Sequence, residues 1–90
     1  MDRATFESEL LRDGYEIIAN GMPPNRANPE HAHEFDARVM VLAGEITITR
    51  GGAATTFRPG DTCSVPRGEL HGEQAGPQGV AYIAGRRTAV

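Results

Sequence analysis

The sequence contains no lysine, no tryptophan and a single cysteine, Cys63. Without lysine the chain cannot use an amine side chain to form a Schiff base, and we identify no candidate nucleophile. A lone cysteine forms no intramolecular disulfide, and it excludes zinc or redox sites built on paired cysteines. This cysteine usage is compatible with a reducing compartment, so we expect a cytoplasmic protein.

Basic clusters and long apolar runs are also missing. The sequence has nine arginines and twelve acidic residues, which gives a net charge of −3. Among the arginines, only Arg86 and Arg87 are adjacent in the sequence. A nucleic-acid-binding protein usually has a basic face, so we expect no nucleic-acid partner. No apolar segment approaches the roughly 18 residues that span a bilayer, and acidic residues stand where a secretory signal needs an apolar stretch. We therefore expect a mature, complete chain with no membrane association.

The 90 residues suffice for one small domain, which we expect to span residues 1–90. Residues 4–13 are the one candidate helix, because Phe6 and Leu10 lie four residues apart on one face with Leu11 beside them. A domain of this size buries a thin core. A bound metal or a homodimer would help to stabilise it, and we expect a homodimer.

After Gly14, which is placed to end the helix, residues 15–85 form a succession of short β-type segments separated by turn residues. The segment 45–50 alternates apolar and polar side chains, as a half-buried strand does. The expected strands are 15–19, 38–43, 45–50, 55–58, 62–65, 70–74 and 80–84. The expected turns and irregular segments are 22–29, 51–52, 59–60, 66–68 and 76–79. Turn signals at this spacing, without intervening helices, predict an antiparallel sandwich or barrel.

The sequence has three histidines, His31, His33 and His71. In an extended segment alternate side chains share a face, so His31 and His33 point the same way. Two imidazoles at that spacing can bind one metal ion. Taken alone this pattern is weak, because exposed or hydrogen-bonded histidines often show the same spacing by chance.

Turn residues around these histidines strengthen the metal interpretation. The residues that carry the pattern are Gly44, Gly60, Pro66, Gly68 and His71. In type and spacing they resemble the two sequence motifs of the cupin family, here in the form of a small bacterial cupin. The resemblance implies an all-β fold, an antiparallel double-stranded β-helix or jelly-roll barrel, with a short N-terminal α-helix. It also implies that His31, His33 and His71 converge as metal ligands and leave one side of the metal open.

The sequence departs from the family pattern at Ala37, where the resemblance calls for a metal-ligating glutamate. Alanine cannot bind a metal, so three alternatives remain open for the fourth position. Water completes a three-histidine site, or Glu73, which shares the face of His71, acts as a ligand or pocket acid rather than as a solvated carboxylate. Asp36 reaches the site only if its strand begins late or carries a bulge. Otherwise we expect Asp36 to form a salt bridge or a turn cap with Arg38.

A three-imidazole site suits several divalent transition metals, and Fe, Zn, Ni, Cu and Mn remain equally open. We expect a small, largely apolar pocket beside the metal that takes a small-molecule ligand or substrate. The expected lining residues are Phe35, Val39, Val41, Ile46 or Ile48, Val65 and Tyr82. The leading hypothesis is a metal-dependent enzyme of the dioxygenase or isomerase type. The alternatives are a non-catalytic ligand-binding or sensor domain whose metal orients the ligand, and a dimerisation unit with a structural metal.

The lone cysteine has two interpretations. Cys63 shares the face of Val65 in a strand of period two, which favours a buried small hydrophobe. A redox-sensing thiol near the metal is the alternative.

Overall fold

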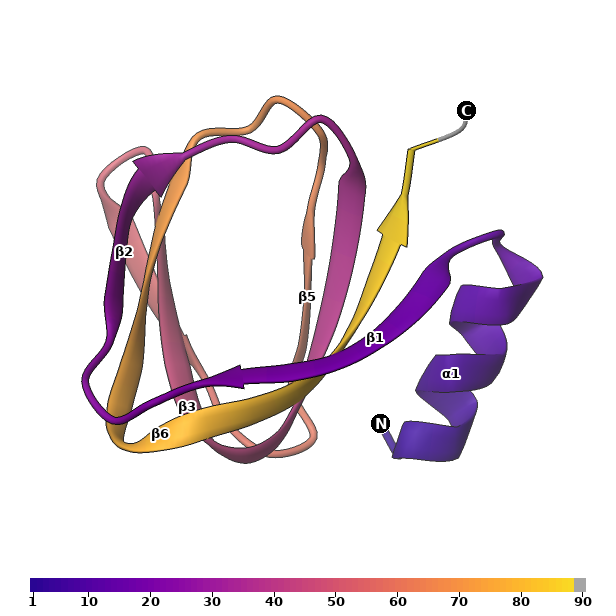
Figure 1. Ribbon diagram of the computed structural model, residues 1–90, viewed down its shortest axis with the longest axis horizontal. Helices are drawn as coiled ribbons and strands as arrows, with labels where there is room; N and C mark the ends of the chain where they lie inside the picture. Colours follow the sequence, from indigo (N-terminus) through magenta and orange to yellow (C-terminus); the bar gives the residue numbers. More distant parts are fainter. Residues whose placement is uncertain (89–90) are drawn as a thin grey trace.

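The computed structural model describes residues 1–88. One helix precedes six strands: α1 (Arg3–Arg12), β1 (Glu16–Met22), β2 (Ala27–His31), β3 (Asp36–Arg50), β4 (Ala53–Phe57), β5 (Thr62–Val65) and β6 (His71–Arg87). All the strand pairs are antiparallel. Figure 1 shows the strands wrapping into a barrel, with α1 standing outside it. The fold is therefore the antiparallel jelly roll with a short N-terminal helix that the sequence predicts.

Two long strands hold this barrel together. Strand β6 pairs with β1, β2 and β3, and strand β3 pairs with β4, β5 and β6. The sequence pattern predicts two shorter strands in place of each, and this prediction is wrong where the two segments join. In place of the turn expected at 76–79, β6 continues, and the register with β3 shifts between Gly44 and Ile46. Gly44 has φ +71° there, and a Cβ atom on it would collide with the carbonyl oxygen of Gly79.

These irregularities change which alternate residues face the interior. On β3, Val41 and Ile46 belong to one buried core cluster although one is odd-numbered and the other even-numbered. Two register shifts relative to β6 lie between these two residues, one between Val41 and Ala43 and the other between Gly44 and Ile46. An extra residue in one strand moves every later side chain to the opposite face. Both halves of β3 can therefore contribute side chains to the same interior.

Strand β2 begins within segment 22–29, which is expected from the sequence to be irregular, and runs on to His31. Ala27 pairs with Gln74 and His31 with His71, and the register shifts between Asn28 and His31. Pro29 occupies this shift, where its missing N–H costs no ladder hydrogen bond. Proline hid the strand from a pattern-based prediction, and the strand carries the first histidine to its place.

Helix α1 covers the outer face of the sheet. It begins after Asp2, whose side chain accepts a hydrogen bond from the backbone N–H of Thr5 at 2.8 Å. Phe6 and Leu10 are fully buried against β3 and β6, in a cluster separate from the barrel interior. The expectation that Leu11 packs beside them is wrong, because its side chain is 67% exposed. Among residues 1–88, the length and apolar character that a membrane-crossing helix needs are not combined in any helix.

Candidate metal centre

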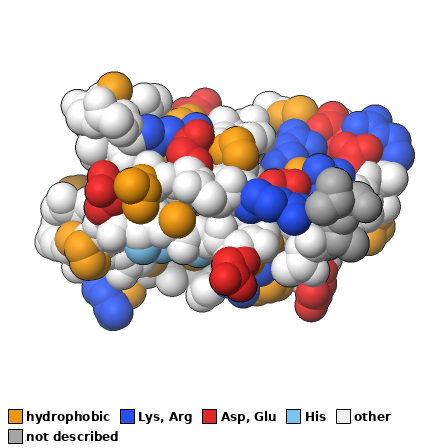
Figure 2. Space-filling view, turned by 90° about the horizontal axis from the view of Figure 1, so that it is seen from above, with side chains coloured by type: hydrophobic (Ala, Val, Ile, Leu, Met, Phe, Trp, Pro, Cys, Tyr) orange, Lys and Arg blue, Asp and Glu red, His pale blue; other side chains and the backbone are white. Residues whose placement is uncertain are grey.

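The three histidines come together at one end of the barrel. His31 ends β2 and His71 begins β6, while His33 follows in the connection to β3. One ring nitrogen from each lies within 4.8 Å of one from each of the others. His71 is 1% exposed, whereas His31 and His33 are partly exposed. Figure 2 shows histidine side chains, in pale blue, reaching the surface on this face of the molecule.

Backbone carbonyls fix the orientation of two of the rings. The Nδ1 atom of His31 lies 2.8 Å from the carbonyl oxygen of Pro29, and that of His71 lies 3.0 Å from the carbonyl oxygen of Glu69. A carbonyl oxygen only accepts, so each Nδ1 carries the proton and donates. Nε2 is then the ring nitrogen left to bind a metal, which is how metal-binding histidines are usually held.

His33 completes the set as a neutral imidazole. Burial lowers its pKa, and the neighbouring His71 and His31 lower it further. Its Nδ1 atom is buried without a hydrogen-bond partner among the described residues. Three clustered imidazoles, one with an unpartnered buried nitrogen, are compatible with a site for a divalent transition metal.

The turn between β5 and β6 secures the position of His33. The backbone N–H of Gly68 donates to the carbonyl oxygen of His33 at 2.9 Å. Gly68 has φ +79°, which side-chain-bearing residues rarely adopt. This glycine of the sequence motif therefore ties the segment that carries His33 to the strand that begins at His71. Figure 1 shows the two connections meeting above the barrel.

Glu73 lies beside the histidines on β6. Its Oε2 atom is 4.0 Å from the Nε2 atom of His71, and its Oε1 atom accepts a hydrogen bond from the Nδ2 of Asn28 at 2.8 Å. The side chain is 20% exposed and lines the cavity that His33 also lines. The spacing of two residues from His71 is the sequence signal that locates it. Ala37, at the position of the missing glutamate, also lines this cavity.

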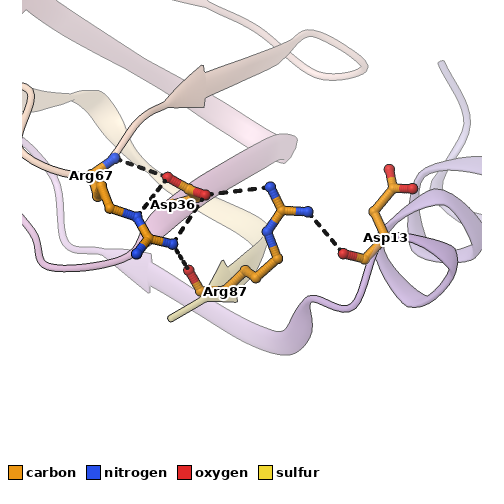
Figure 3. Close-up of polar contacts among 4 residues, drawn as sticks. All are labelled: Asp13, Asp36, Arg67 and Arg87. Carbon is orange, nitrogen blue, oxygen red and sulfur yellow. Dashed lines mark hydrogen bonds and ion pairs between the residues drawn. The ribbon is translucent and has the colours of Figure 1, made fainter. Parts of the chain in front are cut away.

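Asp36 lies outside the histidine cluster, in an ion-pair network drawn in Figure 3. Its Oδ1 accepts from the backbone N–H of Arg67 at 3.1 Å, and its Oδ2 lies 3.3 Å from Nη2 of Arg87. Hydrogen bonds from Arg67 lower the pKa of Asp36 to about 2. Strand β3 starts at Asp36 without an initial bulge, so this side chain faces away from the neighbouring Ala37. The expectation that Asp36 pairs with Arg38 is also wrong.

Two further pairings complete this part of the structure. Arg38 pairs with Glu9 of the helix, at 3.1 Å, in place of Asp36. Arg87 donates from Nη1 to the carbonyl oxygen of Asp13 at 2.9 Å. The network thus joins the start of β3, the end of β6 and the end of the helix. It stabilises the frame of the site without entering it.

A cavity of about 110 Å³ adjoins the histidine cluster at His33, which is one of its lining residues. Of the residues predicted to line it, the structure places Phe35, Val39, Ile46, Ile48, Val65 and Tyr82 there. Val41 instead packs deeper, in the core cluster with Ile46, Ile48, Ala75 and Val80. Sequence reasoning missed four lining residues: Ile18, Asn20, Ala84 and Arg86. Ile18 and Asn20 lie on β1, and they could have been found only from the pairing of β1 with β6, which sets Asn20 opposite Tyr82.

The environment of Cys63 supports its interpretation as a buried hydrophobe. The residue packs against the core cluster of the barrel interior. Burial raises the pKa of its thiol to about 11, so the unreactive protonated form dominates at neutral pH.

The fold and the site together define the class of protein: a small antiparallel β-barrel with three imidazoles gathered at one end. The chain belongs to the cupin family, because the family model described as "Cupin domain" matches residues 21–78, more than half of the sequence. No curated protein matches it significantly.

Solved structures share the fold. A protein of unknown function from Rhizobium leguminosarum is 19% identical, with a TM-score of 0.78 over 83% of this chain and 71% of that one. The polyketide cyclase RemF from Streptomyces resistomycificus is 27% identical, with a TM-score of 0.73 over 83% of this chain. This chain spans only 55% of the cyclase. KdgF from Halomonas sp. is 20% identical, with a TM-score of 0.69 over 81% of this chain and 68% of its own.

Proposed function

We propose that this cupin is a metal-dependent enzyme that moves a proton on a small carbonyl-containing molecule, an isomerase-type reaction. The observation that carries the proposal is a carboxylate, Glu73, set 4.0 Å from His71 in a small cavity beside the three clustered imidazoles. His31, His33 and His71 would hold the metal. A bound divalent metal would polarise the carbonyl group and so acidify the adjacent carbon.

Glu73 is the residue assigned to proton transfer. Its Oε1 is engaged by Asn28, which leaves Oε2 on the side of His71 to accept or return the proton. The hydrogen bond from Asn28 also limits rotation of the carboxylate, so its second oxygen stays directed at the site. A general base must be held within reach of the proton it removes.

The rest of the cavity supplies a mostly apolar surface with one further proton donor. Burial raises the pKa of Tyr82, and the charge of Glu73 raises it further, so its hydroxyl stays protonated at neutral pH. It is therefore suited to donate a hydrogen bond to a substrate oxygen. Aliphatic side chains, among them Val39 and Val65, line the cavity around it. The likeness to a polyketide cyclase supports chemistry on carbonyl compounds.

Hydrogen–deuterium exchange tests the proposal without knowledge of the substrate. Zinc-loaded protein is incubated in deuterated water with a panel of small ketones and 2-oxo acids, and loss of the α-proton signal is followed by NMR. The wild type should catalyse exchange in at least one compound. Glu73→Gln should keep its metal and lose exchange by about a hundredfold or more.

A matched control comes from Glu7, a partly exposed carboxylate on α1 that does not line the cavity. Glu7→Gln should exchange at the wild-type rate. Equal rates for wild type and Glu73→Gln would refute the role of Glu73.

A non-catalytic ligand-binding domain is the second candidate. Ala37 lines the cavity where the family resemblance calls for a ligating glutamate, so the metal would have one ligand fewer than in that pattern. A ligand that raises the melting temperature strongly, exchanges no proton and is recovered unchanged would favour this function over the enzyme.

A further inference from the structure

Arg86 lies at the cavity on a stack of two rings. Its Cζ atom is 4.8 Å from the ring centroid of Phe35. The Phe35 ring in turn lies 4.5 Å from that of His33, with the two planes only 8° apart. Arg86 and Phe35 both line the cavity that adjoins the histidines. The guanidinium is therefore positioned relative to the histidine cluster through a single phenyl ring.

The guanidinium edge of Arg86 has no partner among the described residues. Neither a hydrogen bond nor an ion pair joins this side chain to another of residues 1–88. The adjacent Arg87 differs, because it binds Asp36 and the carbonyl oxygen of Asp13. The contact of Cζ with the Phe35 ring is a cation–π contact and occupies no hydrogen-bond acceptor, so the N–H groups of Arg86 remain without an acceptor among the described residues. That edge matches the two oxygens of a carboxylate in a bidentate pair.

The charges that line the cavity are separated. Besides Arg86, the charged side chain among the lining residues is Glu73, and Asn28 holds it by a hydrogen bond next to His71. Tyr82 lies within the influence of both groups, since Glu73 raises its pKa and Arg86 opposes that shift. An anionic group is attracted to Arg86 and repelled by Glu73. A ligand with one carboxylate thus has a single favourable orientation, with its other end toward Glu73 and the histidines.

The cavity also limits the size of the ligand. Its volume of about 110 Å³ is smaller than the roughly 150 Å³ of an engineered cavity that binds benzene. The enclosed part therefore accommodates on the order of six non-hydrogen atoms or fewer. A longer molecule would have to extend into solvent past Arg86, whose side chain is exposed.

We infer that Arg86 is a specificity-determining residue that binds the carboxylate of a short carboxylic acid, so that the substrate class of this site is small carboxylates such as 2-oxo acids. The inference rests on the proposed function for the reaction at the other end of the ligand. The role of Arg86 in binding is measurable without turnover.

Calorimetric titration with pyruvate, on metal-loaded and on chelator-treated protein, tests the inference directly. The wild type should bind pyruvate, and Arg86→Gln should bind it about tenfold more weakly in both metal states. Arg86→Lys, which keeps the charge but not the fork of donors, should fall between them. Pyruvamide, which has no charge, should bind weakly and equally to wild type and Arg86→Gln. Arg26→Gln, at an exposed arginine that does not line the cavity, should match the wild type.

Three results would overturn the assignment. These are absence of pyruvate binding to the wild type, equal affinity of wild type and Arg86→Gln, and tighter binding of inorganic phosphate than of pyruvate. Because Arg86 is exposed, the variants should keep the wild-type melting temperature, which is measured on the same samples. If pyruvate binding depends on Arg86 but proton exchange is absent, the proposed reaction fails and the carboxylate site stands. If proton exchange occurs but pyruvate binding is independent of Arg86, the proposed reaction stands and the carboxylate site fails.

Discussion

His31 and His71 face each other across strands β2 and β6, and their ring centroids lie 4.4 Å apart. Each Nδ1 bonds to the carbonyl oxygen of the residue two positions before its own histidine, Pro29 or Glu69. The same local hydrogen bond thus orients both rings on neighbouring strands. The site depends on this strand pairing as much as on the residue types.

Removal of one imidazole should abolish metal binding. For His33→Ala we expect bound metal to fall from about one ion per chain to near zero after dialysis, measured by elemental analysis. A metal that binds only the folded state stabilises it, so a chelator should lower the melting temperature of the wild type and leave that of the variant unchanged.

The neighbouring Glu34 provides the control for this variant. Its side chain is exposed and does not belong to the histidine cluster. Glu34→Gln should retain the full metal content. A His33→Ala protein that keeps wild-type metal would show that the cluster is not the binding site.

Asp36→Asn should destabilise the fold without loss of metal. The pKa of Asp36 is lowered to about 2 by Arg67 and Arg87 from a usual value of 3.8. Its ionised form is therefore favoured in the folded state. The stabilisation it provides is present above pH 3.8 and disappears as the pH falls toward about 2.

Urea unfolding of wild type and Asp36→Asn from neutral pH down to pH 2 checks this prediction. The difference in unfolding free energy should be constant above about pH 5 and should shrink through the acid range. A difference that grows on acidification contradicts it. Loss of metal in the variant would instead place Asp36 in the site.

Ala37→Glu tests the vacant ligand position. Ala37 is 9% exposed and lines the cavity, so a glutamate there would place a carboxylate in a largely buried setting. We expect the metal-free variant to lose about 1–3 kcal/mol of unfolding free energy, because burial of an unpaired charge is unfavourable. Saturating metal should recover most of this loss by pairing with the carboxylate. Ala37→Gln, of similar size but without charge, should show a smaller recovery.

Local sequence patterns were sufficient for several features. The hairpin turn at Gly51 and Gly52 joins β3 to β4 with both residues at positive φ, as the glycine pair predicts. The helix face formed by Phe6 and Leu10 follows from their spacing. The convergence of His31, His33 and His71 was implied by the family resemblance. These features depend on neighbouring residues or on a motif that spans the barrel.

Features that depend on long-range pairing were beyond local patterns. Asp36 has its partners at Arg67 and Arg87, which approach it only when the end of β6 lies beside the start of β3. Arg86 enters the cavity because β6 continues past the glycines and proline of residues 76–79 and reverses its facing there. A turn at that point would have ended the strand. The strand continues there because its register with β3 shifts between Gly44 and Ile46, which the local sequence of β6 does not reveal.

The close approach of β3 and β6 at Gly44 makes that glycine the most sensitive backbone position that we identify. In Gly44→Ala the new Cβ would meet the carbonyl oxygen of Gly79 and would sit at φ +71°, so we expect a loss of about 2–3 kcal/mol or more in unfolding free energy. Gly52→Ala separates the two causes. Its φ is +83° but no atom lies within 4 Å of the added Cβ, so about 1 kcal/mol is expected. Chemical denaturation measures both, and equal losses would show that backbone conformation alone, rather than contact with β6, requires glycine at position 44.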